Sequence, residues 1–197
     1  MPTDRQELRH RLITVASLQG GYFTAAQALE AGYRYPNQKF HVDRGNWNRV
    51  DRGIFRLPEW PIGPHDDLVR WSLWALGRAV VSHVTALTVH GYGEFESSRV
   101  NLTVPPRFAK ADAAVVLHRA LLANDDIQVR EGFRVTTVMR SLIDVAGAGA
   151  DQDQLASAIA EAQQAGAITL RRLRERAEEV DVRAALRIEQ ALGKVNS

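Results

Sequence analysis

The sequence predicts an α+β protein built from two domains. Residues 24–57 carry, in order, a short helical pattern, a second short helical pattern and a hairpin pattern rich in basic residues. Three prolines and a glycine follow within residues 58–64 and interrupt regular structure. Beyond them helical and strand patterns are mixed, and the chain after residue 149 is helical. We therefore predict one domain at residues 1–60 and a mixed α/β to α-helical C-terminal domain at residues 64–197.

The first predicted helix runs from about Asp4 to Ser17. Leu8, Leu12 and Val15 recur at the spacing of one helix face. The two glycines at positions 20 and 21 end this helix.

A capping box marks the start of the second helix. The Thr24 hydroxyl can accept from the Gln27 amide while the Gln27 side chain reaches back to the Thr24 backbone. Gly32 then closes the helix, which we predict at residues 25–31.

The third helix has a clear start and an ambiguous end. Pro36 suits its first position, because proline lacks the N–H that a first turn leaves unpaired. Phe40 and Val42 alternate as strand residues do, so the helix either stops near Phe40 or continues to Asp43 before Gly45. We expect the longer form.

A hairpin follows the third helix. Trp47, Val50, Ile54 and Phe55 favour strands, and residues 51–53 supply a turn that ends in glycine. Helix, turn, helix and basic hairpin in this order predict a winged helix-turn-helix, a DNA-binding fold. Trp47 and Phe55 could stack on a nucleotide, but we interpret them as core residues.

The third helix and the hairpin hold the candidate DNA contacts. Asn37 and Gln38 carry carboxamides that can pair with adenine, and Lys39 or Arg34 can reach guanine or phosphate. The hairpin arginines, and Arg56 beside them, can contact phosphate without reading sequence. The predicted DNA-binding residues are Arg34, Tyr35, Asn37, Gln38, Lys39, His41, Arg44, Asn46, Arg49 and Arg52.

The charge distribution favours a polyanionic partner for the N-terminal domain. Residues 1–57 hold nine Lys or Arg against five Asp or Glu, a net charge of +4. The remaining residues hold sixteen against eighteen, a net charge of −2, so the basic excess belongs to the N-terminal domain.

Composition excludes several classes of protein. The chain has no cysteine, which excludes disulfides, thiolate nucleophiles and cysteine-based zinc sites. It has no apolar run long enough for a signal peptide or a membrane span. We expect a cytoplasmic protein that does not contact a membrane.

The second region alternates helix and strand signals. The acidic pair Asp66–Asp67 suits a positively polarised helix start, and Ser82 and Thr169 suit N-caps. The predicted elements are a helix from Pro64 to Gly77 with Leu68, Trp71 and Ala75 inward; a helix from Ser82 to Gly91; strands at 100–104, 115–117 and 133–135; a helix at 138–145; and two helices with the stripes Leu155, Ile159, Ala162 and Leu170, Leu173, Ala177, Val180.

Catalysis is not predicted. His83, His90, His118 and Asp144 could form a site, and His83 and His90 share a helix face. However, the sequence has no HExxH, no GxSxG and no phosphate-binding glycine loop. We predict no enzymatic activity and no cofactor or metal.

A cluster of arginines at positions 171, 172, 174 and 176 offers a second candidate for nucleic-acid contact. We interpret it as a solvated helix face, because acidic residues follow at helical spacing. The predicted pairs are Arg171 with Glu175, Arg174 with Glu178 and Arg176 with Glu179.

Residues 20–147 resemble the AbiEi-type antitoxins of bacterial type IV toxin-antitoxin and abortive-infection systems. The resemblance lies in GYFTAAQA at 21–28, HVDRGNW at 41–47, RGIFRL at 52–57, SHVTALTVHG at 82–91, NLTVP at 101–105 and RVTTVMRSLID at 134–144.

This resemblance implies a transcriptional repressor that binds inverted repeats in its own promoter. It also implies an antitoxin that counters a nucleotidyltransferase-type toxin, with the antitoxic activity largely in the C-terminal region, as part of phage resistance. Inverted repeats require two copies of the protein, either as a weak dimer or as monomers binding cooperatively.

Two alternatives for the second region stay open at the level of sequence. It can be a protein-interaction module that neutralises the toxin by direct binding, or an enzyme that modifies the toxin by kinase-like phosphotransfer.

Overall fold

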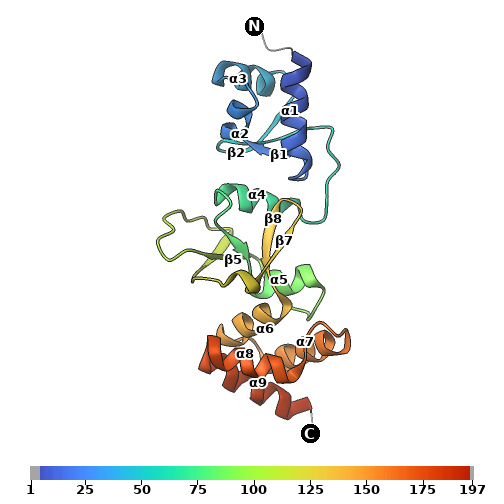
Figure 1. The fold of residues 1–197 in the computed structure, drawn as a ribbon, viewed down its shortest axis with the longest axis vertical. Coiled ribbons are helices and arrows are strands. Elements are labelled where there is room, and N and C mark those ends of the chain that lie inside the picture. Colours follow the sequence, from blue (N-terminus) through green and yellow to red (C-terminus); the bar gives the residue numbers. More distant parts are fainter. Residues whose placement is uncertain (1–4, 196–197) are drawn as a thin grey trace. The chain divides into compact units, whose positions relative to one another are not determined.

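The computed structural model describes residues 5–195 and divides into two compact units. The first unit comprises the chain up to residue 78 together with residues 130–133, and the second comprises the rest. Helices and short strands occur in both units (Figure 1), which confirms the predicted α+β class. No helix within residues 5–195 combines the length and apolar character needed to cross a bilayer.

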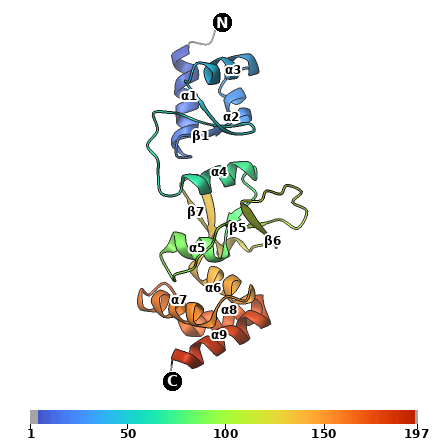
Figure 2. The ribbon, with the colours of Figure 1, turned by 180° about the vertical axis from the view of Figure 1, so that it is seen from behind.

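The first unit has the topology of a winged helix-turn-helix. Its three strands form an antiparallel sheet in the order β1-β3-β2, in which β2 and β3 are the hairpin, or wing. Strand β1 and helices α1, α2 and α3 can be followed in Figures 1 and 2. Its elements are α1 (Arg5–Ser17), β1 (Tyr22–Thr24), α2 (Ala25–Glu30), α3 (Tyr35–Asp43), β2 (Asn48–Asp51), β3 (Ile54–Arg56) and α4 (Asp66–Trp74).

Local signals account for the helix ends in this unit. The Gln27 N–H donates to Thr24 Oγ1 (3.2 Å) and the Thr24 N–H donates to Gln27 Oε1 (2.8 Å), so the predicted capping box forms. Helix α3 continues to Asp43, which confirms the longer form, and Gly45 follows with a φ of 72°. The predicted start of α1 at Asp4 lies outside the described residues.

An aromatic cluster forms the core of the first unit. The rings of Phe23 and Trp47 meet edge to face at 4.8 Å, and Phe55 lies 5.7 Å from each of them. All three side chains are buried together with Leu12. Trp47 and Phe55 are therefore core residues, as predicted.

The first unit extends further along the chain than the predicted domain boundary at residues 60–64. Arg56 pairs with Asp66 across 3.0 Å and donates to the Pro61 carbonyl (2.8 Å). Asp66 also accepts from the Gly63 N–H (2.9 Å). These contacts hold the proline-rich segment and α4 against β3, and the division between the units falls after Arg78.

The second unit combines a five-stranded sheet with a helical layer. The strand order is β6-β5-β4-β8-β7; β4 is antiparallel to β5 and parallel to β8, and β5 is parallel to β6. Its elements are β4 (Val80–Val81), α5 (His83–His90), β5 (Val100–Val104), β6 (Val115–Arg119), the 3₁₀ turn η1 (Asn124–Asp126), β7 (Ile127–Arg130), β8 (Phe133–Thr136), α6 (Val138–Gly147), α7 (Gln152–Gln164), α8 (Leu170–Val180) and α9 (Val182–Val195). Strands β4 and β7 were not predicted.

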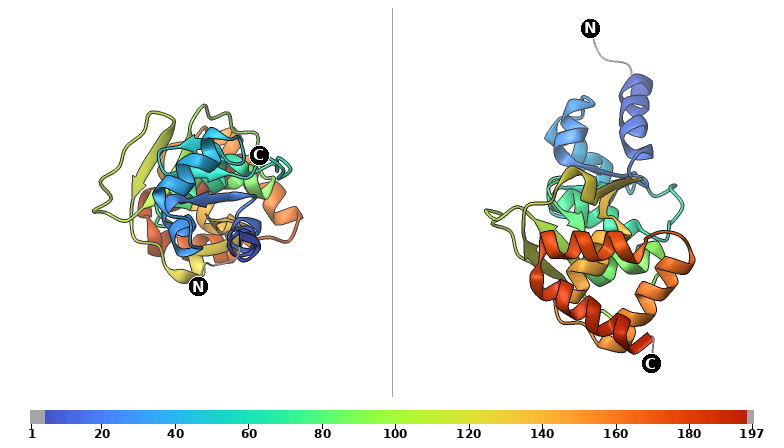
Figure 3. Two further views of the ribbon diagram at one scale, coloured as in Figure 1. Left: turned by 90° about the horizontal axis from the view of Figure 1, so that it is seen from above. Right: turned by 60° about the horizontal axis from the view of Figure 1, so that its bottom comes forward.

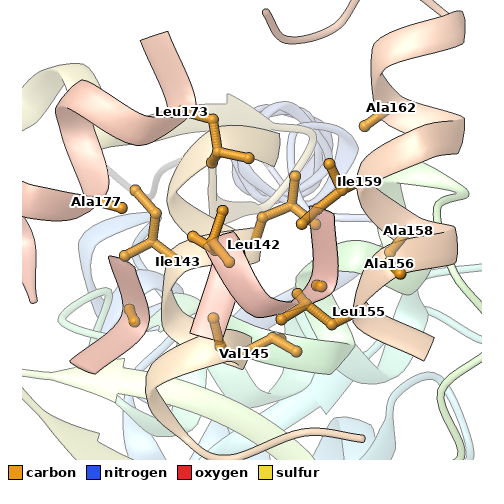
Figure 4. Packing of buried hydrophobic residues seen from close by; sticks show 14 of the residues in the cluster. Leu142, Ile143, Val145, Leu155, Ala156, Ala158, Ile159, Ala162, Leu173 and Ala177 are labelled. Carbon is orange, nitrogen blue, oxygen red and sulfur yellow. The ribbon is translucent and has the colours of Figure 1, made fainter. Parts of the chain in front are cut away.

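Helix α6 is the centre of the helical layer. Leu142 and Ile143 on α6 are fully buried among side chains of α7 and α8, including Leu155 and Leu173 (Figure 4). Helix α9 packs against α6, α7 and α8, and the last three helices, orange to red in Figure 3, lie side by side. The predicted apolar stripes of α7 and α8 are the buried faces.

One predicted cap is correct and one is not. The Thr169 side chain accepts from the Arg172 N–H at the start of α8. Ser82 precedes α5, but its hydroxyl makes no cap; it contacts His83 Nδ1 (2.9 Å) and Thr103 Oγ1 (2.8 Å) instead. The serine prefers these buried side-chain partners because they too need hydrogen bonds.

Candidate nucleic-acid interface

Helix α3 exposes a mixed polar and aromatic surface. The side chains of Tyr35 and Phe40 are 66% and 53% exposed, and Asn37 and Lys39 are exposed beside them. Asn37 makes no side-chain hydrogen bond within residues 5–195. A helix with free amide and aromatic groups offers both hydrogen bonds and apolar contact to base edges.

A groove of about 440 Å³ separates α3 from the wing. Tyr35, Lys39 and Asp43 line its helix side, and Arg49 and Phe55 line its wing side. Lys39 Nζ pairs with Asp43 Oδ2 across 2.5 Å, which holds both side chains on this edge of the helix.

The predicted arginines around this surface stay free of carboxylates. Arg34, Arg44, Arg49 and Arg52 are exposed, and none forms an ion pair within the described part of the chain. Arg44 lies over the Phe40 ring (5.5 Å) and Arg49 over the Phe55 ring (5.9 Å), contacts that orient a guanidinium without neutralising it.

Four arginines elsewhere in the first unit are neutralised by carboxylates. The pairs have separations of 3.7 Å or less, and they join Arg9 with Glu59, Arg11 with Glu7, Arg56 with Asp66 and Arg70 with Asp51. The arginines of α3 and the wing differ from these four because their positive charge is uncompensated.

Gln38 does not lie on the exposed face of α3, contrary to the sequence prediction that made it a candidate DNA contact. Its side chain is 4% exposed, and Nε2 donates to the Ala25 carbonyl (3.0 Å) and the Tyr33 carbonyl (2.9 Å). The amide joins α3 to α2 and to the turn between them. Both carbonyl oxygens accept a hydrogen bond from the Gln38 amide, because a backbone carbonyl removed from water needs a donor.

His41 and Asn46 also have structural roles that the sequence did not reveal. The His41 ring stacks on Trp47 (4.8 Å between centroids, 14° between planes), and its Nδ1 lies 3.2 Å from Asn46 Nδ2. Burial lowers the pKa of His41, so the ring is neutral at pH 7 and carries no charge toward phosphate.

Arg56, a predicted phosphate contact, is buried instead. Its guanidinium lies over the Tyr22 ring (5.3 Å) and is held by Asp66. The predicted DNA-binding residues that are exposed are Arg34, Tyr35, Asn37, Lys39, Arg44, Asn46, Arg49 and Arg52, and of these Asn46 is engaged by His41.

Three of the four arginines in the cluster on α8 are paired with carboxylates, two of them as predicted. Arg171 pairs with Glu175 (3.8 Å) and Arg176 with Glu179 (2.8 Å), as predicted. Arg174 pairs with Glu189 on α9 (2.6 Å) rather than with Glu178, because α9 packs beside α8.

The structure brings His83, His118 and Asp144 of the candidate catalytic set to one cavity and leaves His90 outside its lining. The rings of His83 and His118 stack at 3.4 Å, whereas His90 contacts the Thr136 carbonyl (2.8 Å). Asp144 pairs with Arg140 across 2.8 Å, and Arg140 also pairs with Asp126 (3.0 Å). Arg140 was not among the predicted site residues, although its spacing of four residues from Asp144 is a signal for a helical ion pair.

Among the described residues, no group of three or more His, Asp or Glu side chains is placed to hold a metal ion.

Comparison with known proteins supports the fold and leaves the function open. No family model matches the chain, and no curated protein matches it. The crystal structure of the Rv2827c protein from Mycobacterium tuberculosis is similar, with a TM-score of 0.57 and 16% sequence identity, covering 93% of this chain and 77% of that chain. At this identity the similarity concerns the fold alone.

We expect substitution of Gln38 to lower the stability of the protein. Replacing Gln38 with Ala removes both hydrogen bonds of the amide and leaves the buried end of one of them, the Tyr33 carbonyl, without this donor, so we expect the free energy of unfolding to fall by about 1–3 kcal/mol. Urea denaturation followed by circular dichroism measures it. Asn37→Ala, one residue away on the exposed face, is the control and should change stability by less than about 0.5 kcal/mol. Equal effects of the two substitutions would contradict the structural role of Gln38.

Proposed function

We propose that the first unit binds double-stranded DNA through α3 and the wing. The observation that carries this proposal is the set of four exposed arginines without carboxylate partners around an exposed polar helix. Arginines without carboxylate partners can bind the phosphates of DNA, and this binding is favourable because it releases the counterions condensed on the DNA. The winged helix-turn-helix topology supports the same function.

In this proposal the exposed residues have different roles. Asn37 reads a base edge in the major groove, with Arg34 or Lys39 reaching guanine or phosphate. Tyr35 and Phe40 offer apolar contact to a thymine methyl group. Arg44, Arg49 and Arg52 contact phosphates and add affinity without sequence preference.

We further propose that the protein is a cytoplasmic antitoxin and autorepressor of a type IV toxin-antitoxin system. The support is the resemblance of residues 20–147 to AbiEi-type antitoxins, together with the DNA-binding surface. Two copies, as a weak dimer or as cooperating monomers, would occupy an inverted repeat in the promoter. The second unit would counter a nucleotidyltransferase-type toxin encoded beside it.

The wing arginines predict a salt-dependent loss of DNA affinity. Arg49→Ala and Arg52→Ala should each weaken binding to operator and random DNA alike. Each should also flatten the slope of log affinity against log salt concentration by about 0.9, the value for one lost phosphate contact. Gel shift with DNA from upstream of the gene, at several salt concentrations, measures both effects.

Arg11→Ala is the matched control for this experiment. Arg11 is equally charged and half-exposed, but it is paired with Glu7 on α1, away from the wing. We expect its salt slope to match that of the unchanged protein. If all three variants bind DNA as well as the unchanged protein does, the wing is not a phosphate-binding surface.

We expect substitution of Asn37 to reduce the preference for operator DNA over random DNA. Asn37→Ala should lower operator affinity by about 1–3 kcal/mol and leave affinity for random DNA unchanged. Competition gel shifts with the two DNAs measure the ratio, and Asn124→Ala in the second unit serves as a control. An unchanged ratio would remove Asn37 from base reading, and equal affinity of the unchanged protein for both DNAs would exclude specific repression.

The antitoxin role predicts rescue of growth. Cells that express the toxin candidate from the adjacent gene should grow only when this protein is coexpressed. Arg49→Ala in the full chain tests whether this rescue needs DNA binding, and we expect rescue to survive the substitution. Failure of the intact protein to restore growth would count against an antitoxin.

A further inference from the structure

The first unit contains a cavity of about 690 Å³ that the DNA-binding proposal does not use. Its lining comes from α1, from α3 and the connection that follows it to β2, and from residues 57–59 after β3. It shares no lining residue with the groove between α3 and the wing. A cavity of this volume has room for a small molecule.

Three rings line this cavity and contact one another. The centroid of the Tyr33 ring is 5.0 Å from that of Trp47 and 5.2 Å from that of His41, and the His41 and Trp47 centroids are 4.8 Å apart. The His41 and Trp47 planes are nearly parallel (14°), whereas the Tyr33 ring stands across both, at 80° and 69°. Rings this close together can present their polar atoms to one small molecule.

Two of these rings carry donors without a partner. Neither the Tyr33 hydroxyl nor the Trp47 indole N–H makes a hydrogen bond within residues 5–195. The residues are only 6% and 4% exposed, yet neither polar atom is sealed from solvent. Buried tyrosine and tryptophan usually find a partner for this group. Both residues line this cavity and neither lines the α3 groove, so we assign the two open donors to the cavity.

His41 supplies a third donor. The Asn46 amide nitrogen can only donate, so His41 Nδ1, 3.2 Å from it, is the acceptor of that contact. The ring is neutral at pH 7 because burial lowers its pKa, and its single proton is therefore on Nε2. Nε2 has no hydrogen-bond partner in the described part of the chain, and it too is not sealed from solvent.

The charges at the cavity balance. Arg9 pairs with Glu59 across 3.2 Å, and both side chains are more than half exposed. No other Lys, Arg, Asp or Glu among the described residues belongs to the lining. Burial raises the pKa of Tyr33 and the Arg9 charge lowers it in part, so the hydroxyl lies on the side of Arg9 and stays protonated. The lining therefore has an excess of hydrogen-bond donors without a net charge.

We propose that this cavity binds a small, neutral, planar molecule through its carbonyl oxygen. A carbonyl oxygen has two lone pairs, so it can accept from both the Tyr33 hydroxyl and the Trp47 indole N–H. His41 Nε2–H is available to a second acceptor of the same ligand. Ile13, which is half-buried, and Pro58, which is exposed, offer apolar contact to the rest of the molecule.

Other kinds of small molecule match this lining less well. A cation finds donors where it needs acceptors, and the carboxylate of Glu59 already has Arg9 as its partner. An anion could accept from the same donors, but it would lie in a cavity that the Glu59 carboxylate also lines. A hydrocarbon would leave the donors of Tyr33 and Trp47 without an acceptor in a largely buried place, which is costly.

Nuclear magnetic resonance of the nitrogen-15-labelled full chain at pH 7 tests the proposal. The probes are acetophenone, benzoate and benzylamine, which share a phenyl ring and differ in their polar group. The chain has four tryptophans, and the Trp47 indole N–H signal reports on the proposed donor directly. We expect acetophenone to shift this signal saturably, with a dissociation constant of about 1–10 mM, because so small a probe binds weakly. The other three indole signals should stay in place.

The remaining probes fix the chemistry of the ligand. Benzylamine, a cation at pH 7, should not shift the Trp47 signal, and benzoate should bind more weakly than acetophenone. Absence of a saturable shift with acetophenone, or equal binding of benzylamine, overturns the proposal. Tighter binding of benzoate than of acetophenone overturns the assignment of a neutral ligand.

Tyr33→Phe locates the site without disturbing the fold. It removes only the hydroxyl, which bonds to no other described residue, and keeps the ring that packs on Trp47. Loss of one hydrogen bond should lower acetophenone affinity about three- to tenfold. Tyr92→Phe, in the second unit, is the matched control and should leave affinity unchanged. Equal affinity of the two variants would place the ligand elsewhere and overturn the assignment. These results do not depend on whether the first unit binds DNA.

Discussion

The buried aromatic cluster around Trp47 is the constraint on which the surface formed by α3 and the wing depends. Trp47 contacts Phe23 and Phe55 of the sheet on one side and the His41 ring of α3 on the other. Because one side chain packs against both α3 and the strands, it fixes the distance between helix and wing. The spacing of the exposed arginines, and hence of the phosphates they could contact, follows from this packing.

The Gln38 amide secures the other end of the same helix. It bridges α2 and the turn that precedes α3, so the two helices cannot separate without breaking two hydrogen bonds, one of them buried. The exposed face of α3 takes no part in these contacts with α2. A rigid helix that holds its exposed side chains in fixed positions favours specific recognition of a partner.

The second unit is organised by a different interaction, a buried network of charges. Asp126 accepts from Arg140 on α6 and from Arg176 on α8, which ties the 3₁₀ turn η1 to two helices of the helical layer. Buried charges are costly unless each is matched, and here they are. In the first unit four exposed arginines without carboxylate partners gather around α3 and the wing, whereas in the second unit Arg140 and Arg176 share the buried carboxylate of Asp126.

The sequence by itself determined the order of most elements, the capping box, the apolar stripes and the basic character of α3 and the wing. Those features depend on neighbouring residues, whose spacing is visible in the chain. Only the tertiary structure decided that Gln38, His41 and Arg56 face inward, because their partners Ala25, Trp47 and Asp66 are brought to them by the fold. It also decided that the two-residue strand β4 forms, which depends on pairing with β5 and β8 rather than on its own composition. The stacking of His83 on His118 likewise requires a helix and a strand that the fold alone brings together.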